Sequence, residues 1–223
     1  MDKILTHLNG NILCSIDTET TGFDVSRHEI LQIALVPLDF KFDPMSGVLP
    51  FNMWLKPQRP QNIDPEALRV NKIDLAHILR VGFHPDTAAD HLLTWRDAFN
   101  LPPRKKLVPL GKNWAFDREF IKAWLGPTLF EDIFNEVYAR DLQHVAHFFN
   151  DVADQRAERY PFPKVKLSYI ASQLEVEHAK AHDALGDCFI TAECYKLLVK
   201  RAATFWPIKF EQKEETHDNT RTT

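Results

Sequence analysis

Several features that this sequence lacks exclude whole classes of protein. No apolar run reaches the ~18 residues that a membrane-spanning helix requires, and the first residues contain no apolar segment typical of a signal peptide. The 27 Lys and Arg do not outnumber the 31 Asp and Glu, so no global basic field draws the chain onto nucleic acid. The three cysteines form no CxxC pair and lie in apolar segments, which argues against disulfides and zinc. We expect a cytoplasmic protein without a membrane partner.

Contact with a polyanion would have to come from local basic patches, or from metal ions that invert the charge of an acidic site. Two basic clusters in predicted loops could contact phosphates, namely residues 104–106 and the pair Lys164 and Lys166. Both clusters are equally well interpreted as solubilising surface patches. Trp114 could stack on a base, although a tryptophan beside Phe116 is more often part of a core.

The order of the apolar patterns predicts an α/β fold with a mixed sheet. Apolar runs at residues 12–16, 29–38 and 51–56 predict three strands that pair antiparallel, and runs at residues 107–110 and 137–139 predict two more. Helical periodicity separates and follows these runs. A short helix is predicted to begin at residue 64. Further helices are predicted at residues 74–80, 85–100, 116–125, 141–152, 167–174 and 184–201. About five strands flanked by α-helices are therefore expected.

The chain has no internal repeat and no visible second domain, so residues 1–206 are expected to form a single domain. Residues 207–223 are polar and charged, which predicts a disordered tail. Residues 39–47 predict a turn-rich connection between strands. The charged segment 154–166, with two prolines, predicts an exposed loop.

Two carboxylates at the end of the first predicted strand point in the same direction. Side chains two residues apart in a strand share one face, so Asp17 and Glu19 project together with Thr18 between them. Carboxylates this close repel each other unless a cation or a proton lies between them. Oxygen ligands at this spacing suit Mg²⁺ or Mn²⁺. The alternative is a solvated strand end, which a DxE pair alone does not exclude.

Other acidic residues follow at the junctions between predicted elements. Asp117 lies in the first turns of a helix that follows a buried strand. His182 precedes the last long helix, and Asp187 lies about one turn inside it. Asp141 is better interpreted as a helix N-cap than as a ligand. Taken singly, each of these residues could also be an ordinary cap or surface residue, as we expect for Asp24 and Asp183, which should face water.

In chain order these residues resemble the three motifs of the DnaQ-like (DEDDh) 3′–5′ exonucleases, a family with an RNase H-like fold. The matching residues are Asp17, Glu19 and Gly22 in the first motif, Asn113, Phe116 and Asp117 in the second, and His182, Ala184, Leu185 and Asp187 in the third. The resemblance extends from residue 11 to about residue 203. One departure is Lys112, because many members of the family have histidine directly before the asparagine of the second motif.

The resemblance implies a two-metal hydrolase that acts on phosphodiester bonds at the 3′ end of single-stranded DNA or RNA and releases nucleoside 5′-monophosphates. It implies that Asp17, Glu19, Asp117 and Asp187 bind two Mg²⁺ ions, for which Mn²⁺ could substitute. His182 would take a proton from the attacking water. The residues expected to contact the substrate are Thr18, Thr20, Phe23, Asn113 and Phe116. For Phe23, packing in the core is an equal alternative.

Two other functions remain open at this point. A catalytically silent exonuclease fold could serve as a subunit of a polymerase or repair complex, although four carboxylates and a histidine argue for activity. The pair His182 and Asp183 alone would suggest an HD-type phosphohydrolase, but that fold is helical and needs further histidine ligands. The sequence does not distinguish DNA from RNA as substrate, and proofreading would require a polymerase as a partner chain.

Overall fold

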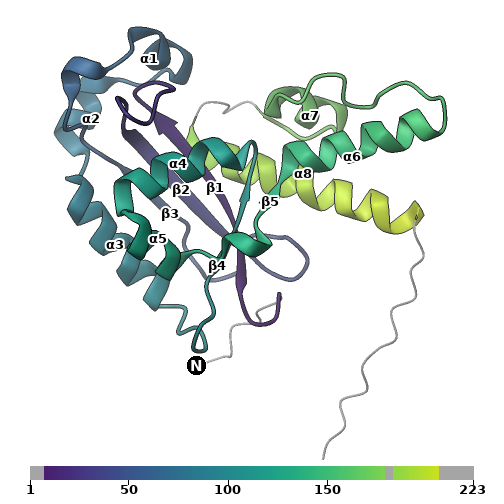
Figure 1. Ribbon diagram of the computed structural model, residues 1–223, viewed down its shortest axis with the longest axis horizontal. Helices are drawn as coiled ribbons and strands as arrows, with labels where there is room; N and C mark the ends of the chain where they lie inside the picture. Colours follow the sequence, from purple (N-terminus) through teal and green to yellow (C-terminus); the bar gives the residue numbers. More distant parts are fainter. Residues whose placement is uncertain (1–7, 179–182, 206–223) are drawn as a thin grey trace, which may run out of the picture.

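The computed structural model describes residues 8–178 and 183–205, and its centre is a five-stranded sheet in the order β3-β2-β1-β4-β5 (Figure 1). The first three strands pair antiparallel, whereas β4 runs parallel to β1 and β5 runs parallel to β4. The strands are β1 (Ile12–Thr20), β2 (Ile30–Leu38), β3 (Phe51–Trp54), β4 (Leu107–Gly111) and β5 (Arg140–Asp141). The predicted mixed sheet, antiparallel in its first three strands, is confirmed.

Helices cover both faces of this sheet. The first group consists of α1 (Pro65–Asn71), α2 (Leu75–Val81), α3 (Pro85–Asp97), α4 (Trp114–Leu125) and α5 (Pro127–Ile133). The second consists of α6 (Leu142–Gln155), α7 (Leu167–Gln173) and α8 (Ala184–Phe205). Two short 3₁₀ turns, Pro60–Asn62 and Glu136–Tyr138, complete the described elements. Helices α3, α4 and α5 lie on one side of the sheet and α6, α7 and α8 on the other (Figure 1).

Alternation along β1 divides the interior into two cores. Leu13 packs into the core beneath α6, α7 and α8, whereas Ile12, Cys14 and Ile16 pack into the core beneath α3, α4 and α5. Because the period is two, Asp17 belongs to the face that α8 covers. Both faces of β1 are therefore buried, and only its carboxyl end can present polar side chains.

The fifth strand lies later in the chain than the apolar pattern predicted. Residues 137–139 were expected to form it, but Glu136–Tyr138 is a 3₁₀ turn, and β5 begins at Arg140. Val137 is 87% exposed, so its apolar side chain does not mark a buried strand. The pairing partner of Gly111 is Asp141, a residue without any strand signal of its own. Helix α5 was also not predicted, although its first residue, Pro127, is of a type well suited to the first turn of a helix.

The prediction of an exposed loop over residues 154–166 is wrong in one respect. Phe162 is fully buried in the core beneath α6 and α8. The side chain of Asn150 accepts a hydrogen bond from the Phe162 amide at 2.9 Å and donates one to its carbonyl at 2.8 Å. A single aromatic residue in a charged segment is enough to anchor the segment, and periodicity does not reveal it.

Three expectations remain, of which two concern described residues. All three cysteines are buried free thiols, as predicted. Among residues 8–178 and 183–205, no helix is long and apolar enough to cross a membrane. The tail predicted at residues 207–223 lies outside the described residues and stays a prediction.

Candidate active site

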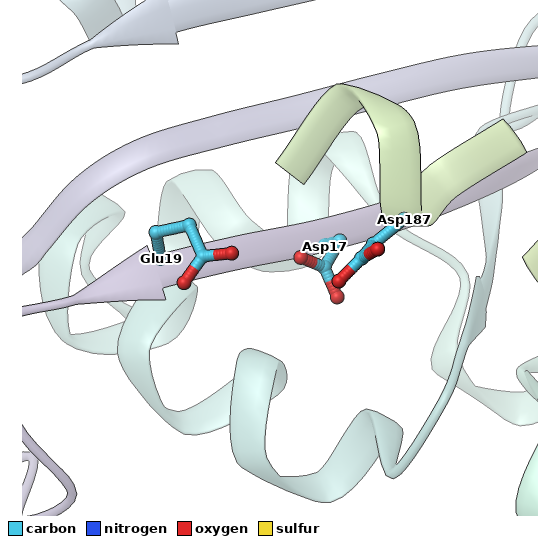
Figure 2. Close-up of side chains that lie close together, drawn as sticks. All are labelled: Asp17, Glu19 and Asp187. Atoms are coloured by element: carbon cyan, nitrogen blue, oxygen red, sulfur yellow. The ribbon is translucent and has the colours of Figure 1, made fainter. Parts of the chain in front are cut away.

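Three carboxylates from two distant parts of the chain, β1 and α8, meet at the end of β1. Asp17 and Glu19 leave the same face of the strand, and Asp187 comes from the first turn of α8 (Figure 2). One carboxylate oxygen from each residue lies within 4.8 Å of the other two. The DxE spacing thus predicted the orientation of the first two residues, and the packing of α8 against the sheet adds the third.

Hydrogen bonds hold the start of α8 against the sheet. The Ser15 hydroxyl donates to the Cys188 carbonyl at 2.9 Å, and the Cys188 thiol donates to the Ala34 carbonyl at 3.3 Å. These bonds link one turn of α8 to both β1 and β2. They fix the position of Asp187 relative to Asp17.

Gln32 is a supporting residue that the sequence analysis missed. Its fully buried side chain accepts a hydrogen bond from the Ala184 amide at 3.2 Å and donates one to the Asp183 carboxylate at 2.7 Å. Asp183 in turn accepts from the Gly186 amide at 3.2 Å, which caps the first turn of α8. The expectation that Asp183 simply faces water is therefore wrong. The only signal in the sequence was a polar residue in the middle of the apolar run of β2.

Asp117 reaches the site from the other face of β1. It lies in the first turn of α4 and is 3% exposed. The amide and the hydroxyl of Thr18 both donate to its Oδ1 atom, at 2.9 and 2.7 Å. Thr18, which we expected to contact substrate, thus orients an acidic residue. Asp117 lies near enough to Asp17 for its charge to affect that residue, although it is not one of the three within 4.8 Å.

Burial and mutual repulsion raise the pKa values of these acidic residues. Burial raises the pKa of Asp17 well above its usual range, and the charges of Asp117, Glu19 and Asp187 add to the effect. Burial, followed by the charge of Asp187, raises the pKa of Glu19 to about 8. Burial raises the pKa of Asp117 to about 7, against the opposite effect of the Thr18 hydrogen bonds. A divalent cation would favour the ionised forms and relieve this repulsion.

These shifts predict that the metal-free protein loses stability as the pH rises. Glu19 and Asp117 bind protons more tightly in the folded chain than at their ordinary pKa values of 4.5 and 3.8. The free energy of unfolding should therefore fall between about pH 4 and pH 8. We expect a melting temperature several degrees lower at pH 8 than at pH 5, since about 1 kcal/mol changes it by about 2–4 °C at this size. Scanning calorimetry in EDTA measures this difference.

The matched control adds Mg²⁺ to the same protein at both values of pH. At pH 8 the cation should restore the melting temperature, and at pH 5 it should have little effect because protons already neutralise the site. Potassium chloride at equal ionic strength accounts for simple screening. A melting temperature that rises with pH in EDTA would contradict the assignment of raised pKa values.

Phe23 and Phe116 form an aromatic pair on the segments that follow Glu19 and precede Asp117. Phe23 is 73% exposed, which excludes the core-packing alternative for this residue. Its ring centroid lies 6.2 Å from that of the half-buried Phe116, which packs at 4.9 Å on Phe120. Thr20 is buried, and its hydroxyl donates to the Gly22 carbonyl at 2.7 Å. The segments that carry the first and second motifs therefore meet in space.

Contacts with His28 and Arg59 hold the loop that carries Phe23 in place. A Cβ atom at Gly22 would lie 2.5 Å from the ring of His28, so only glycine allows this contact. The guanidinium of Arg59 donates to the carbonyls of Ser26 at 3.0 Å and His28 at 3.1 Å. The same group lies 3.4 Å from the carboxylate of Glu29. These contacts hold the loop in one conformation and leave the Phe23 side chain exposed.

The turn between β4 and α4 depends on Asp141. Asn113 is exposed and has φ +65°, and its amide donates to the Asp141 carboxylate at 3.0 Å. The Trp114 amide donates to the same carboxylate at 2.9 Å. Asp141 also caps α6 by accepting from Gln143, which confirms the interpretation as an N-cap. Trp114 is 6% exposed and packs near Phe134, so it belongs to the core.

The basic residues expected near phosphates are unequally placed. Residues 104–106 precede β4, which begins opposite Ile12, five residues before Asp17. At ~3.3 Å per residue this cluster is about 16 Å from the carboxylates. Lys106 also donates to the Glu131 carbonyl, so a surface role is the better interpretation of this cluster. Lys164 and Lys166 are exposed before α7 and remain candidates.

His182 lies outside the described residues, and its role as a base stays a prediction.

A sheet of this order, with acidic residues at the carboxyl end of its central strand, places the chain in the class of α/β proteins whose fold is shared by solved exonuclease structures. Within that class, a sequence model of the exonuclease family (RNase_T) matches residues 14–195, and the chain belongs to this family. It is thus a phosphodiester-hydrolysing nuclease of the DnaQ-like group. The HD-type alternative, which requires a helical fold, is excluded.

Individual relatives resemble most of the chain. Ribonuclease T from Wigglesworthia glossinidia brevipalpis is 28% identical over 204 residues, which cover 89% of this chain and 90% of the relative. Exonuclease I from Methylocaldum szegediense has a TM-score of 0.68 and 22% identity, over 86% of this chain and 41% of that one. Exonuclease I from E. coli in complex with a dT13 oligonucleotide has a TM-score of 0.65 and 21% identity, over 87% and 42%. The chain spans about two-fifths of these exonuclease I chains, so this likeness concerns the fold.

Proposed function

We propose that this protein is a metal-dependent 3′–5′ exonuclease that removes nucleoside 5′-monophosphates from single-stranded DNA or RNA. The observation that carries the proposal is the convergence of Asp17, Glu19 and Asp187, with Asp117 beside them. Membership of the exonuclease family supports the reaction. The E. coli exonuclease I complex with an oligonucleotide, which shares the fold, supports single-stranded nucleic acid as the substrate.

The donor set fits hard divalent cations. It consists only of carboxylate oxygens, which suit Mg²⁺ and Mn²⁺ better than softer metals. The raised pKa values of Asp17 and Glu19 are the expected sign of a site that lacks its countercharge. In this proposal Asp17 contributes to both metal positions, Glu19 and Asp187 complete one, and Asp117 supports the other. Two bound ions would stabilise the charge on the attacking and leaving oxygens.

The remaining residues position the reactants. Thr18 holds Asp117 in place through two hydrogen bonds, and Gln32 fixes the turn of α8 that carries Asp187. His182 accepts the proton of the attacking water. Phe23 and Phe116 offer aromatic surface on which the terminal base can stack, a contact that accepts any base. The 3′ terminus is then placed so that the last phosphodiester reaches the carboxylates.

An end-directed site predicts that a closed circle of single-stranded DNA survives. In this proposal the loop that carries Phe23 closes the site beyond the carboxylates and admits one terminal nucleotide, so an internal phosphate should not reach them. We expect the linear form to be degraded completely in Mg²⁺ while the circle stays intact. Gel electrophoresis of both forms after equal incubation measures the difference.

The control is the same circle after linearisation at one site, which keeps length and sequence constant. Rapid loss of the circle at a rate close to that of the linear form would overturn the end-directed assignment. The same comparison with RNA circles tests whether the requirement for an end depends on the sugar.

A further inference from the structure

Lys112 follows the last residue of β4 and adjoins the acidic site. β4 ends at Gly111, and its last pair with β1 joins Leu110 to Ser15, two residues before Asp17, so Lys112 directly follows the strand beside this stretch of β1. Val108 and Leu110 pack into the core beneath α8, whereas a Cβ atom at Gly111 would meet Trp114 of α4, so the alternation of β4 up to its last residue leaves the α8 face for the residue that follows.

The backbone around Lys112 is held firmly. A Cβ atom at Gly111 would lie 3.1 Å from the Cα atom of Trp114, so the close packing of the strand end against α4 leaves little room for a larger residue. On the other side, the amides of Asn113 and Trp114 donate to Asp141. Lys112 is half-buried between these fixed points. Its position relative to Asp17 is therefore determined by the fold.

The ammonium group of Lys112 is not used in an ion pair. None of the salt bridges found among residues 8–178 and 183–205 includes it. Other cations are engaged, such as Arg59 with Glu29 and Arg118 with Glu119. In a chain of net charge −4, a cation that is not in an ion pair and lies near the end of β1 can bind an anion.

We propose that Lys112 binds the scissile phosphate of the substrate on the face of the sheet that carries Asp17. The inference rests on the proposed function, because the phosphate must enter beside the carboxylates for the reaction to occur. Phosphate brings additional negative charge to an acidic site, and a lysine at this position offsets it as a point charge. Lys112 is a substrate-contacting residue in this account, whereas the carboxylates bind the metals.

The test combines a protein variant with a substrate in which a single charge is removed. Lys112→Gln and wild-type protein are compared in Mg²⁺ with two competitor oligonucleotides. One has an ordinary 3′-terminal linkage, and the other has a neutral methylphosphonate at that linkage. Each competitor inhibits cleavage of a labelled DNA strand, which gives an apparent inhibition constant for each pair of protein and competitor.

We expect Lys112→Gln to bind the ordinary competitor about tenfold more weakly than wild type does, the loss typical of one charged hydrogen bond. With the neutral linkage the two proteins should bind equally, because the group that Lys112 contacts has lost its charge. Lys112→Arg should retain most of the binding. The matched control is Lys41→Gln. Lys41 is an exposed lysine that follows β2 at the end of the sheet where β1 begins, away from Asp17, and this variant should behave as wild type with both competitors.

An equal loss with both competitors would overturn the inference, because a structural role, or a general attraction to the rest of the strand, does not depend on the charge of that one linkage. If Lys112→Gln does not fold, Lys112→Ala gives the same comparison. The failure of the proposed function is recognised separately, because wild-type protein would then cleave neither DNA nor RNA. Cleavage by wild type together with an equal loss for both competitors would refute the Lys112 contact alone.

Discussion

Replacing Asp17 with asparagine should abolish hydrolysis and leave the fold intact. Asp17 is the central acidic residue, since the charges of Asp117, Glu19 and Asp187 all act on it. The amide keeps the shape of the side chain but not the charge that would contribute to both metal positions. We expect less than a few per cent of wild-type activity in single-turnover assays. In EDTA at pH 8 the variant should melt at the same temperature as wild type or higher, because one repelling charge is removed.

The matched control is Asp151→Asn, the same change at an exposed position on α6. This variant should have full activity. Retention of substantial activity by Asp17→Asn would remove this residue from the centre of the mechanism. A loss of activity accompanied by unfolding would be seen in the melting curve and would require Asp17→Glu as a second variant.

Replacing His182 with alanine should slow the enzyme by roughly 10²-fold or more and flatten its pH profile. A positioned general base contributes about 10²–10⁴-fold, and an unperturbed histidine titrates near ~6.5. Nearby carboxylates favour the protonated form, so the active neutral form should accumulate between about pH 6 and pH 8. Wild-type activity should therefore rise over this range. Initial rates at constant Mg²⁺ measure both effects.

The control for this prediction is His147→Ala, an exposed histidine on α6 that should keep both the rate and the pH profile. If His182→Ala is slow but still shows the wild-type rise with pH, then another group supplies the base. The role of His182 as general base would then be wrong even though the exonuclease activity stands.

The acidic site was predictable because its strongest signals are local. The period of a strand orients Asp17 and Glu19 together, and a helix that follows a buried strand places Asp117 near its start. Within these short segments, geometry depends on only a few dihedral angles. The order of the motifs then indicated that Asp187 belongs with them, and the structure brings its carboxylate to the same place.

The contacts that support the site were not predictable, because they join segments far apart in the chain. Gln32 and Asp183 are 151 residues apart, and no periodicity relates them. Thr18 and Asp117 are 99 residues apart, and Thr18 itself was expected to face the substrate. Such partners depend on the register of strands and on the angle at which a helix packs. Neither quantity can be read from local propensity.

Exposure was the other property that the sequence left open. The sequence allowed Phe23 to be a core residue. Its 73% exposure follows from the conformation of its loop, which depends on contacts with Arg59 and His28. Val137 is a similar case, because its apolar side chain suggested a buried strand but is 87% exposed. Apolar character alone therefore indicates neither burial nor a binding surface.

The measurement that tests the central claim most directly is a time course on a single-stranded oligonucleotide labelled at its 5′ end. Wild-type protein in Mg²⁺ should convert the labelled strand into a ladder that shortens one nucleotide at a time from the 3′ end, and EDTA should stop the reaction. DNA and RNA strands of the same sequence, run in parallel, identify the preferred sugar. A strand that stays at full length in Mg²⁺ on both substrates would contradict the account and favour a catalytically silent subunit. Scattered internal cuts at early times would contradict the 3′–5′ direction.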